Sequence, residues 1–81
     1  MIINKWNYNK SKYEPRKIPD DWYCSTYEAD MKTIVNCPSC GKELEFGKTY
    51  TSREWHTAIG FGYGVCEECY RLEMERAQLY K

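Results

Sequence analysis

Two short stretches, "CPSCGK" at residues 37–42 and "CEECYRLE" at residues 66–73, decide the fold of this chain. Each begins with two cysteines that have two residues between them. Two thiolates at this spacing can reach one ion across a tight turn. Pro38 and Gly41 favour such a turn, because proline fixes one backbone dihedral and glycine frees another. Two such pairs supply the four corners of a tetrahedron.

Zinc is the ion expected at these four thiols, because soft thiolate ligands in tetrahedral geometry suit Zn²⁺; iron also fits a site with four sulfur ligands. One bound Zn²⁺ per chain is therefore predicted. A site with four protein ligands leaves no open position for water, so the zinc is expected to be structural. The predicted ligands are Cys37, Cys40, Cys66 and Cys69.

The residues from Glu67 to about Tyr80 predict a helix, since they contain good helix formers and no glycine or proline. Thiolates in the first turn of this helix would face free backbone N–H groups and the positive end of the helix dipole. At 100° per residue, one face carries Tyr70, Met74 and Ala77, and Leu72 and Leu79 lie roughly opposite. We therefore expect this helix to be covered on both sides.

Alternating patterns predict strands at "KTIVN" (residues 32–36) and "KTYTSREW" (residues 48–55). Another is expected at residues 59–65, where apolar residues alternate with Gly60, Gly62 and Gly64. The bare face of this last strand has two interpretations, a packing requirement within the chain or the close approach of a partner's backbone. Its GxGxG spacing lacks the lysine and Ser/Thr of a phosphate-binding loop.

A cysteine knuckle, a β-hairpin and a second pair on a helix together resemble the treble-clef zinc finger over about residues 35–81. The resemblance implies an α+β fold, a small zinc-stabilised treble clef with an N-terminal extension. Zinc ribbons place the second pair on another hairpin turn, which the helical run after Cys69 disfavours. At 81 residues the hydrophobic core is marginal. Structural zinc in small fingers supplies about 10–16 kcal/mol, which is comparable to the stability of a whole domain.

Residues 1–34 form the predicted N-terminal extension, packed on the zinc domain of residues 35–81. Pro15 and Pro19 predict an extended arm, docked or mobile, and residues 19–32 a short helix. The chain as a whole has zero formal charge. Its first 17 residues nevertheless carry five basic residues against one acidic residue, and the next 19 carry one basic residue against four acidic ones.

The N-terminus lacks the apolar run of a signal peptide, and no stretch is long enough for a membrane span. Paired cysteines in a reduced compartment indicate metal rather than disulfides, so a soluble, cytoplasmic protein is expected. The fifth cysteine, Cys24, is expected to be a small packed hydrophobic residue.

Catalysis is not expected. HNH-type nucleases share the treble clef, but His56 lacks the adjacent acidic residue of their first motif, and no second histidine follows. A zinc deaminase needs H-x-E before P-C-x-x-C, whereas His56 follows the first cysteine pair.

A protein-interaction module is the favoured function, since tyrosine and tryptophan dominate interface hot spots. Aromatic residues around the hairpin are expected to anchor the partner and exposed lysines to set the association rate. The predicted partner-binding residues are Trp55, His56, Phe61, Tyr63, Lys10, Lys12 and Lys17. The alternative is nucleic-acid binding through the basic arm, with phosphates and bases contacted by Lys5, Lys10, Lys12, Arg16 and Lys17 and by Trp6, Tyr8 and Tyr13.

The two cysteine stretches are also similar to the C4 finger of the DksA/TraR proteins, small regulators that bind RNA polymerase. In size and style, the chain resembles Cys₄ proteins carried by phages and mobile elements, which include anti-CRISPR proteins. These resemblances imply a regulator or inhibitor of a host protein complex. They name no specific partner.

Overall fold

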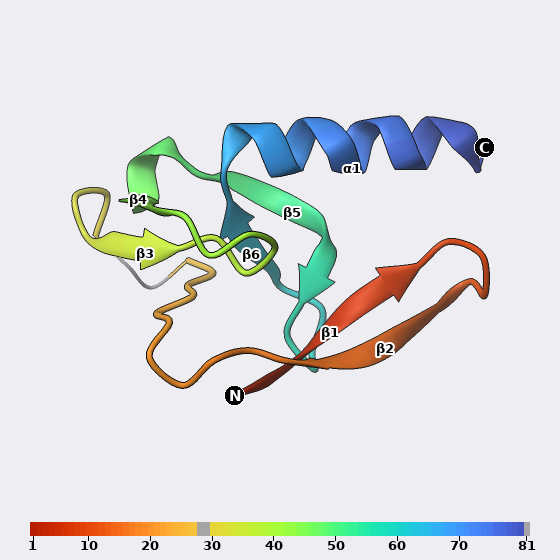
Figure 1. Ribbon diagram of the computed structural model, residues 1–81, viewed down its shortest axis with the longest axis horizontal. Coiled ribbons are helices and arrows are strands. Elements are labelled where there is room, and N and C mark those ends of the chain that lie inside the picture. Colours follow the sequence, from red (N-terminus) through yellow and green to blue (C-terminus); the bar gives the residue numbers. More distant parts are fainter. Residues whose placement is uncertain (28–29, 81) are drawn as a thin grey trace.

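The structure is a computed structural model that describes residues 1–27 and 30–80 (Figure 1). It has an α+β architecture with two antiparallel sheets and a C-terminal helix. In chain order the elements are β1 (Ile2–Asn7), β2 (Lys12–Lys17), β3 (Ile34–Asn36), β4 (Glu43–Glu45), a 3₁₀ helix (Phe46–Lys48), β5 (Tyr50–His56), β6 (Gly62–Val65) and α1 (Glu67–Leu79).

The larger sheet has the strand order β2-β1-β5-β6, and α1 packs along β5 (Figure 1). The β3–β4 hairpin forms a separate two-stranded sheet beside it. Strand β1 pairs with β5, with Asn4 opposite His56 and Lys5 opposite Trp55. One sheet therefore joins the predicted N-terminal extension to the predicted zinc domain.

The strands expected at residues 32–36 and 48–55 are confirmed as β3 and β5, and the expected helix as α1. The strand expected at residues 59–65 is confirmed only from Gly62 onward, as β6, because Ile59 and Gly60 lie in the turn before it. The N-terminal arm is docked, because β1 and β2 form a hairpin in register from the Ile2–Lys17 pair to the Asn7–Lys12 pair. Pro15 lies in β2. This is an edge strand, and its outer side has no neighbouring strand to which a backbone N–H would have to donate a hydrogen bond.

The prediction of a short helix at residues 19–32 is wrong for the residues that are described there. The backbone instead bonds to the first strand of the small sheet. The N–H of Tyr23 donates to the Asn36 side chain at 2.9 Å, and the N–H of Asn36 donates to the carbonyl of Tyr23 at 2.7 Å. Residues 28 and 29 lie outside the described part of the chain.

The expectation that α1 is covered on both sides is also wrong, because Leu72 and Leu79 are exposed. The fully buried position in the middle of the helix is Glu73, at 0% exposure. Its carboxylate faces β5, where it accepts hydrogen bonds from Ser52 and Arg53. The predicted face of Tyr70, Met74 and Ala77 is partly buried, and Tyr70 packs against the core. The polar contacts of Glu73 therefore lie within this covered face.

Strand β5 is irregular between Thr51 and His56, where its register against β6 shifts. The Ser52 hydroxyl oxygen accepts the backbone N–H groups of Glu54 at 3.0 Å and Trp55 at 2.8 Å. The side chains of Glu54 and Trp55 are both buried. In a regular strand two consecutive side chains point to opposite faces, whereas a bulge breaks this alternation. The hydrophobic cluster beneath comprises Ile3, Ile18, Cys37, Trp55, Tyr63, Val65, Cys66 and Cys69.

Among the described residues, no helix combines the length and the apolar character that crossing a membrane requires.

Candidate metal centre

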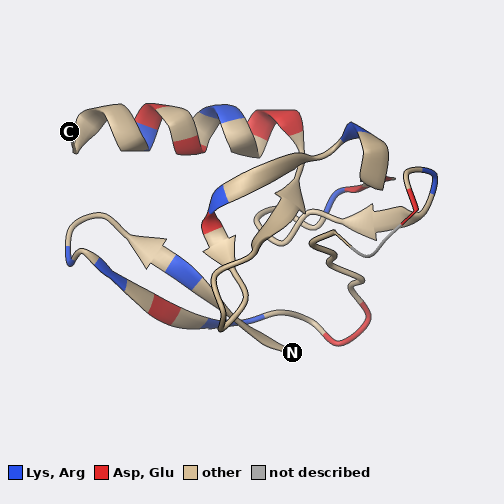
Figure 2. Ribbon diagram, turned by 180° about the vertical axis from the view of Figure 1, so that it is seen from behind, with Lys and Arg blue, Asp and Glu red and all other residues tan. Residues whose placement is uncertain are grey.

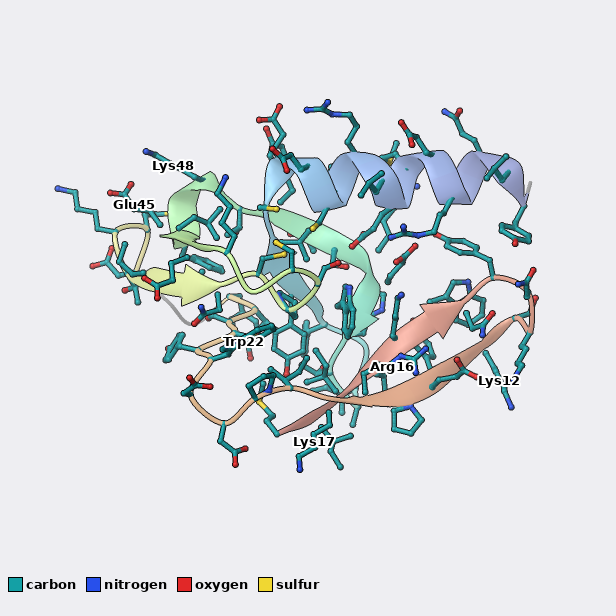
Figure 3. All side chains as sticks on the ribbon, in the orientation of Figure 1. Lys12, Arg16, Lys17, Trp22, Glu45 and Lys48 are labelled. Carbon is teal, nitrogen blue, oxygen red and sulfur yellow. The ribbon has the colours of Figure 1, made fainter. Side chains whose placement is uncertain are left out.

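The first cysteine pair lies on the turn that joins β3 to β4. The Cys37 N–H donates to the Lys42 carbonyl at 2.9 Å, and the Gly41 N–H donates to the Cys37 carbonyl at 2.7 Å. Gly41 has a φ of +83°, which favours glycine. A Cβ at this position would also meet the Trp22 ring at 2.5 Å, so Trp22 supports the turn from outside (Figure 3).

The second pair lies where β6 passes directly into α1. Cys66 occupies the N-cap position with extended backbone angles, and its carbonyl accepts the N–H of Tyr70 at 2.9 Å. Cys69 is in the first helical turn, which also carries Glu67 and Glu68. The predicted placement of this pair at a helix N-terminus is confirmed.

The four thiols meet in one cluster, with all four Sγ atoms within 4.8 Å of one another. The Cys40 and Cys66 sulfurs are 3.7 Å apart. Zn–S bonds of about 2.3 Å place the four sulfurs of a tetrahedral site about 3.8 Å apart. The observed spacing therefore fits one metal ion bound by four sulfur atoms. Cys40 is exposed, and the other three members of the cluster are buried. The cluster is therefore positioned to bind one metal ion.

The surroundings of the thiols act on their pKa values in opposite directions. Burial raises the pKa of Cys37 and of Cys69, because the charged thiolate loses solvation. Burial opposes ionisation of Cys66 too, but hydrogen bonds from the Cys69 backbone and from neighbouring thiols leave its pKa lowered. The helix N-terminus thus favours the thiolate at the N-cap position.

Cys24 lies outside the four-thiol cluster and is partly buried against the hydrophobic core, as expected for a packed residue. Burial and the neighbouring Cys37 raise the pKa of the Cys24 thiol to about 11. Without a metal, the Cys24 thiol is therefore neutral at physiological pH. Its position outside the four-thiol cluster separates it from the metal site.

Two of the predicted partner-binding residues are not on the surface, which corrects that part of the prediction. Trp55 is only 7% exposed and Tyr63 is also buried, because both pack in the core under α1. His56 is partly buried, with its ring 5.4 Å from that of Tyr13. Phe61 is exposed, and so are three predicted lysines: Lys10, Lys12 and Lys17.

The glycines of β6 are required by close packing within the chain. A Cβ at Gly62 would meet the Ser52 carbonyl oxygen at 2.6 Å, and a Cβ at Gly64 would meet the Thr49 hydroxyl at 2.5 Å. The bare face of the strand is therefore filled by neighbouring residues of the same chain. It leaves no room for a partner's backbone.

Sequence reasoning missed a second polar cluster, which lies between β5 and α1. Glu54 is 1% exposed and forms two hydrogen bonds with Arg76, at 2.7 and 2.8 Å. In the sequence of β5, Ser52 and Glu54 are two residues apart and so lie on one face of the strand. This spacing was the available signal that two polar side chains share a face. It gave no indication that the acidic side chain faces inward.

Comparison of the chain with protein-family models, with curated protein sequences and with solved structures finds no match. The assignment of function therefore depends on the metal centre and the surfaces alone.

Proposed function

We propose that this protein is a zinc-stabilised module that binds another protein. The bound ion is Zn²⁺, held by the four clustered thiols in a treble-clef arrangement: the knuckle after β3, the β5–β6 hairpin and α1. With four protein ligands, the ion stabilises the fold and carries out no chemistry. The function then belongs to the surface that this core supports.

An exposed apolar cluster at the turn between β5 and β6 carries this proposal. Ile59 is 80% exposed, and the exposed rings of Tyr27 and Phe61 lie against each other with centroids 5.1 Å apart. Exposed aliphatic and aromatic residues that gather in one place are typical of protein-binding surfaces. We name Tyr27, Ile59 and Phe61 the apolar patch. In this proposal the patch takes the anchoring role that the sequence assigned to Trp55.

The role of exposed lysines in setting the association rate stays a prediction, as does direct binding of nucleic acid. The same holds for the resemblance to DksA/TraR fingers and to phage-borne inhibitors. Both resemblances imply a host protein complex as the target. A chain with zero net charge and an apolar anchor suits a protein target better than it suits nucleic acid, which would favour a strongly basic surface.

Affinity capture from a bacterial lysate, quantified by mass spectrometry, tests the proposal with a matched pair of variants. Ile59→Ser removes an apolar side chain from the patch, and Leu79→Ser removes one of nearly the same exposure, 79%, from the end of α1. Both changes leave the core intact. We expect Ile59→Ser to lose the partner and Leu79→Ser to retain it, with about 2 kcal/mol or more lost at a central anchor. Equal capture by the two variants would contradict the assignment of the patch.

A further inference from the structure

A polar cleft of about 190 Å³ lies between the β1–β2 hairpin and the C-terminal end of α1. Its walls come from both strands of the hairpin, from Glu54 on β5 and from the last turn of the helix. The rings of Tyr8 and Tyr80 stack at 5.6 Å and hold the tip of the hairpin against the helix end. The cleft shares no residue with the apolar patch.

Three cationic and two anionic side chains line this cleft, and both carboxylates already have partners. Glu54 accepts two hydrogen bonds from Arg76, which leaves three guanidinium N–H groups of Arg76 without an acceptor among the described residues. Glu14 accepts a hydrogen bond from Asn7 at 3.0 Å, and this bond lowers the pKa of Glu14. Both carboxylates are therefore already engaged by groups of the same chain.

The other two cations have weaker partners. The Lys5 ammonium lies 5.3 Å from the centre of the Trp55 ring and forms no ion pair with a described carboxylate. Arg16 approaches Glu14 only at 3.6 Å, without a hydrogen bond. In Figure 3, Arg16 lies on the side of β2 toward β1 and the helix, whereas Lys17 points away from them. Figure 2 shows that basic residues recur along this hairpin.

We propose that the cleft binds the phosphate group of a nucleotide, free or within a nucleic-acid strand. A surplus of unused N–H donors and a net charge of +1 call for an anion, and guanidinium groups match the oxygens of phosphate. Tyr8 and Tyr80 line the same cleft, and the outer faces of their stacked rings can stack on a base. This site goes beyond the proposed protein-binding function, and each can fail without the other.

An NMR titration of the zinc-loaded protein at constant ionic strength tests the site, with inorganic phosphate, adenosine and adenosine 5′-monophosphate as probes. We expect shifts at Lys5, Arg16 and Arg76 with phosphate, tighter binding of the monophosphate, and no response to adenosine alone. Arg16→Gln and Lys17→Gln are a matched pair, because these neighbours lie on opposite faces of one strand. Arg16→Gln should weaken monophosphate binding about tenfold, and Lys17→Gln by less than about twofold.

A short single-stranded oligonucleotide forms the second arm and separates the two sources of phosphate. Tighter binding of the oligonucleotide, still dependent on Arg16, assigns the cleft to a nucleic-acid strand. Binding of the monophosphate alone assigns it to a free nucleotide. Equal effects of the two substitutions, or phosphate binding without any gain from the nucleoside part, would overturn the proposal. Zinc content and circular dichroism confirm that each variant is folded.

Discussion

The Ser52 hydroxyl donates a hydrogen bond to the Glu73 carboxylate at 2.7 Å, and this contact joins α1 to the irregular part of β5. The second carboxylate oxygen accepts the backbone N–H of Arg53 at the same distance. The Ser52 oxygen in turn accepts the N–H groups of Glu54 and Trp55. A fully buried glutamate therefore organises the bulge that turns Trp55 into the core.

The stability of the protein should depend on pH through Glu73. Burial raises the pKa of this carboxyl above its usual value, although Ser52 and Arg53 act to lower it. Because the folded state then holds the proton more tightly than the unfolded state, the contribution of Glu73 is fully present below about pH 4.5. It is lost as the pH rises through the folded pKa.

Glu73→Gln removes this titration. The difference in the free energy of unfolding, natural protein minus variant, should therefore decrease as the pH rises above about 4.5. Urea unfolding of both zinc-loaded proteins between about pH 5.5 and pH 8 measures the difference, and the zinc content at each pH confirms that the metal is still bound. A difference that is the same at every pH would show that the Glu73 pKa is not raised.

Arg76→Met should destabilise the fold by leaving the Glu54 carboxylate buried without its partner. Removing one member of a fully buried pair costs about 3–5 kcal/mol, but Arg76 is 38% exposed, so water reduces the expected cost to about 2–3 kcal/mol. Urea unfolding at pH 7 measures this cost. Arg71→Met, on the exposed side of the same helix, is the matched control and should change the stability by less than about 0.5 kcal/mol.

The double variant Arg76→Met with Glu54→Leu separates loss of the partner from loss of packing. Since it leaves no buried charge, it should regain at least about 1 kcal/mol relative to Arg76→Met alone. A double variant that is less stable than the single one would show that the pair contributes through its packing and not through charge neutralisation.

Loss of one metal ligand should unfold the molecule. Cys69→Ser removes a sulfur from the four-thiol cluster, whereas Cys24→Ser changes a thiol that packs outside it. Because a zinc site contributes about 10–16 kcal/mol and a small core cannot replace it, Cys69→Ser should lack native circular dichroism, as should the natural protein after chelation. Cys24→Ser should stay folded and bind one zinc per chain by elemental analysis. A folded Cys69→Ser protein would rule out a structural metal.

The metal centre and its supporting elements could be predicted because their signals are local. Two residues between cysteines define a knuckle, and the uninterrupted run after Cys69 defines a helix. The alternation in residues 48–55 likewise gave the right strand. Each of these features depends on residues that are close in sequence.

The interior could not be predicted in the same way, because it depends on partners far apart in sequence. Hydrophobic periodicity assigned Leu72 and Leu79 to a covered face and gave no reason to bury Glu73. Only the bulge in β5 supplies the donors that make its burial possible. The same bulge buries Trp55, which a regular strand with Glu54 inward would have exposed.

Gly62→Ala should decide between the two interpretations of the glycine-rich strand. A Cβ at this position would lie 2.6 Å from the Ser52 carbonyl oxygen and 2.7 Å from the Thr51 methyl group. The carbonyl belongs to the backbone of β5 and cannot rotate away, so the substitution should cost about 1–3 kcal/mol in urea unfolding. Adding Thr51→Ala removes the methyl contact and should restore only part of that loss. If Gly62→Ala kept full stability but lost the captured partner, the glycine would serve the partner, and the packing explanation would be wrong.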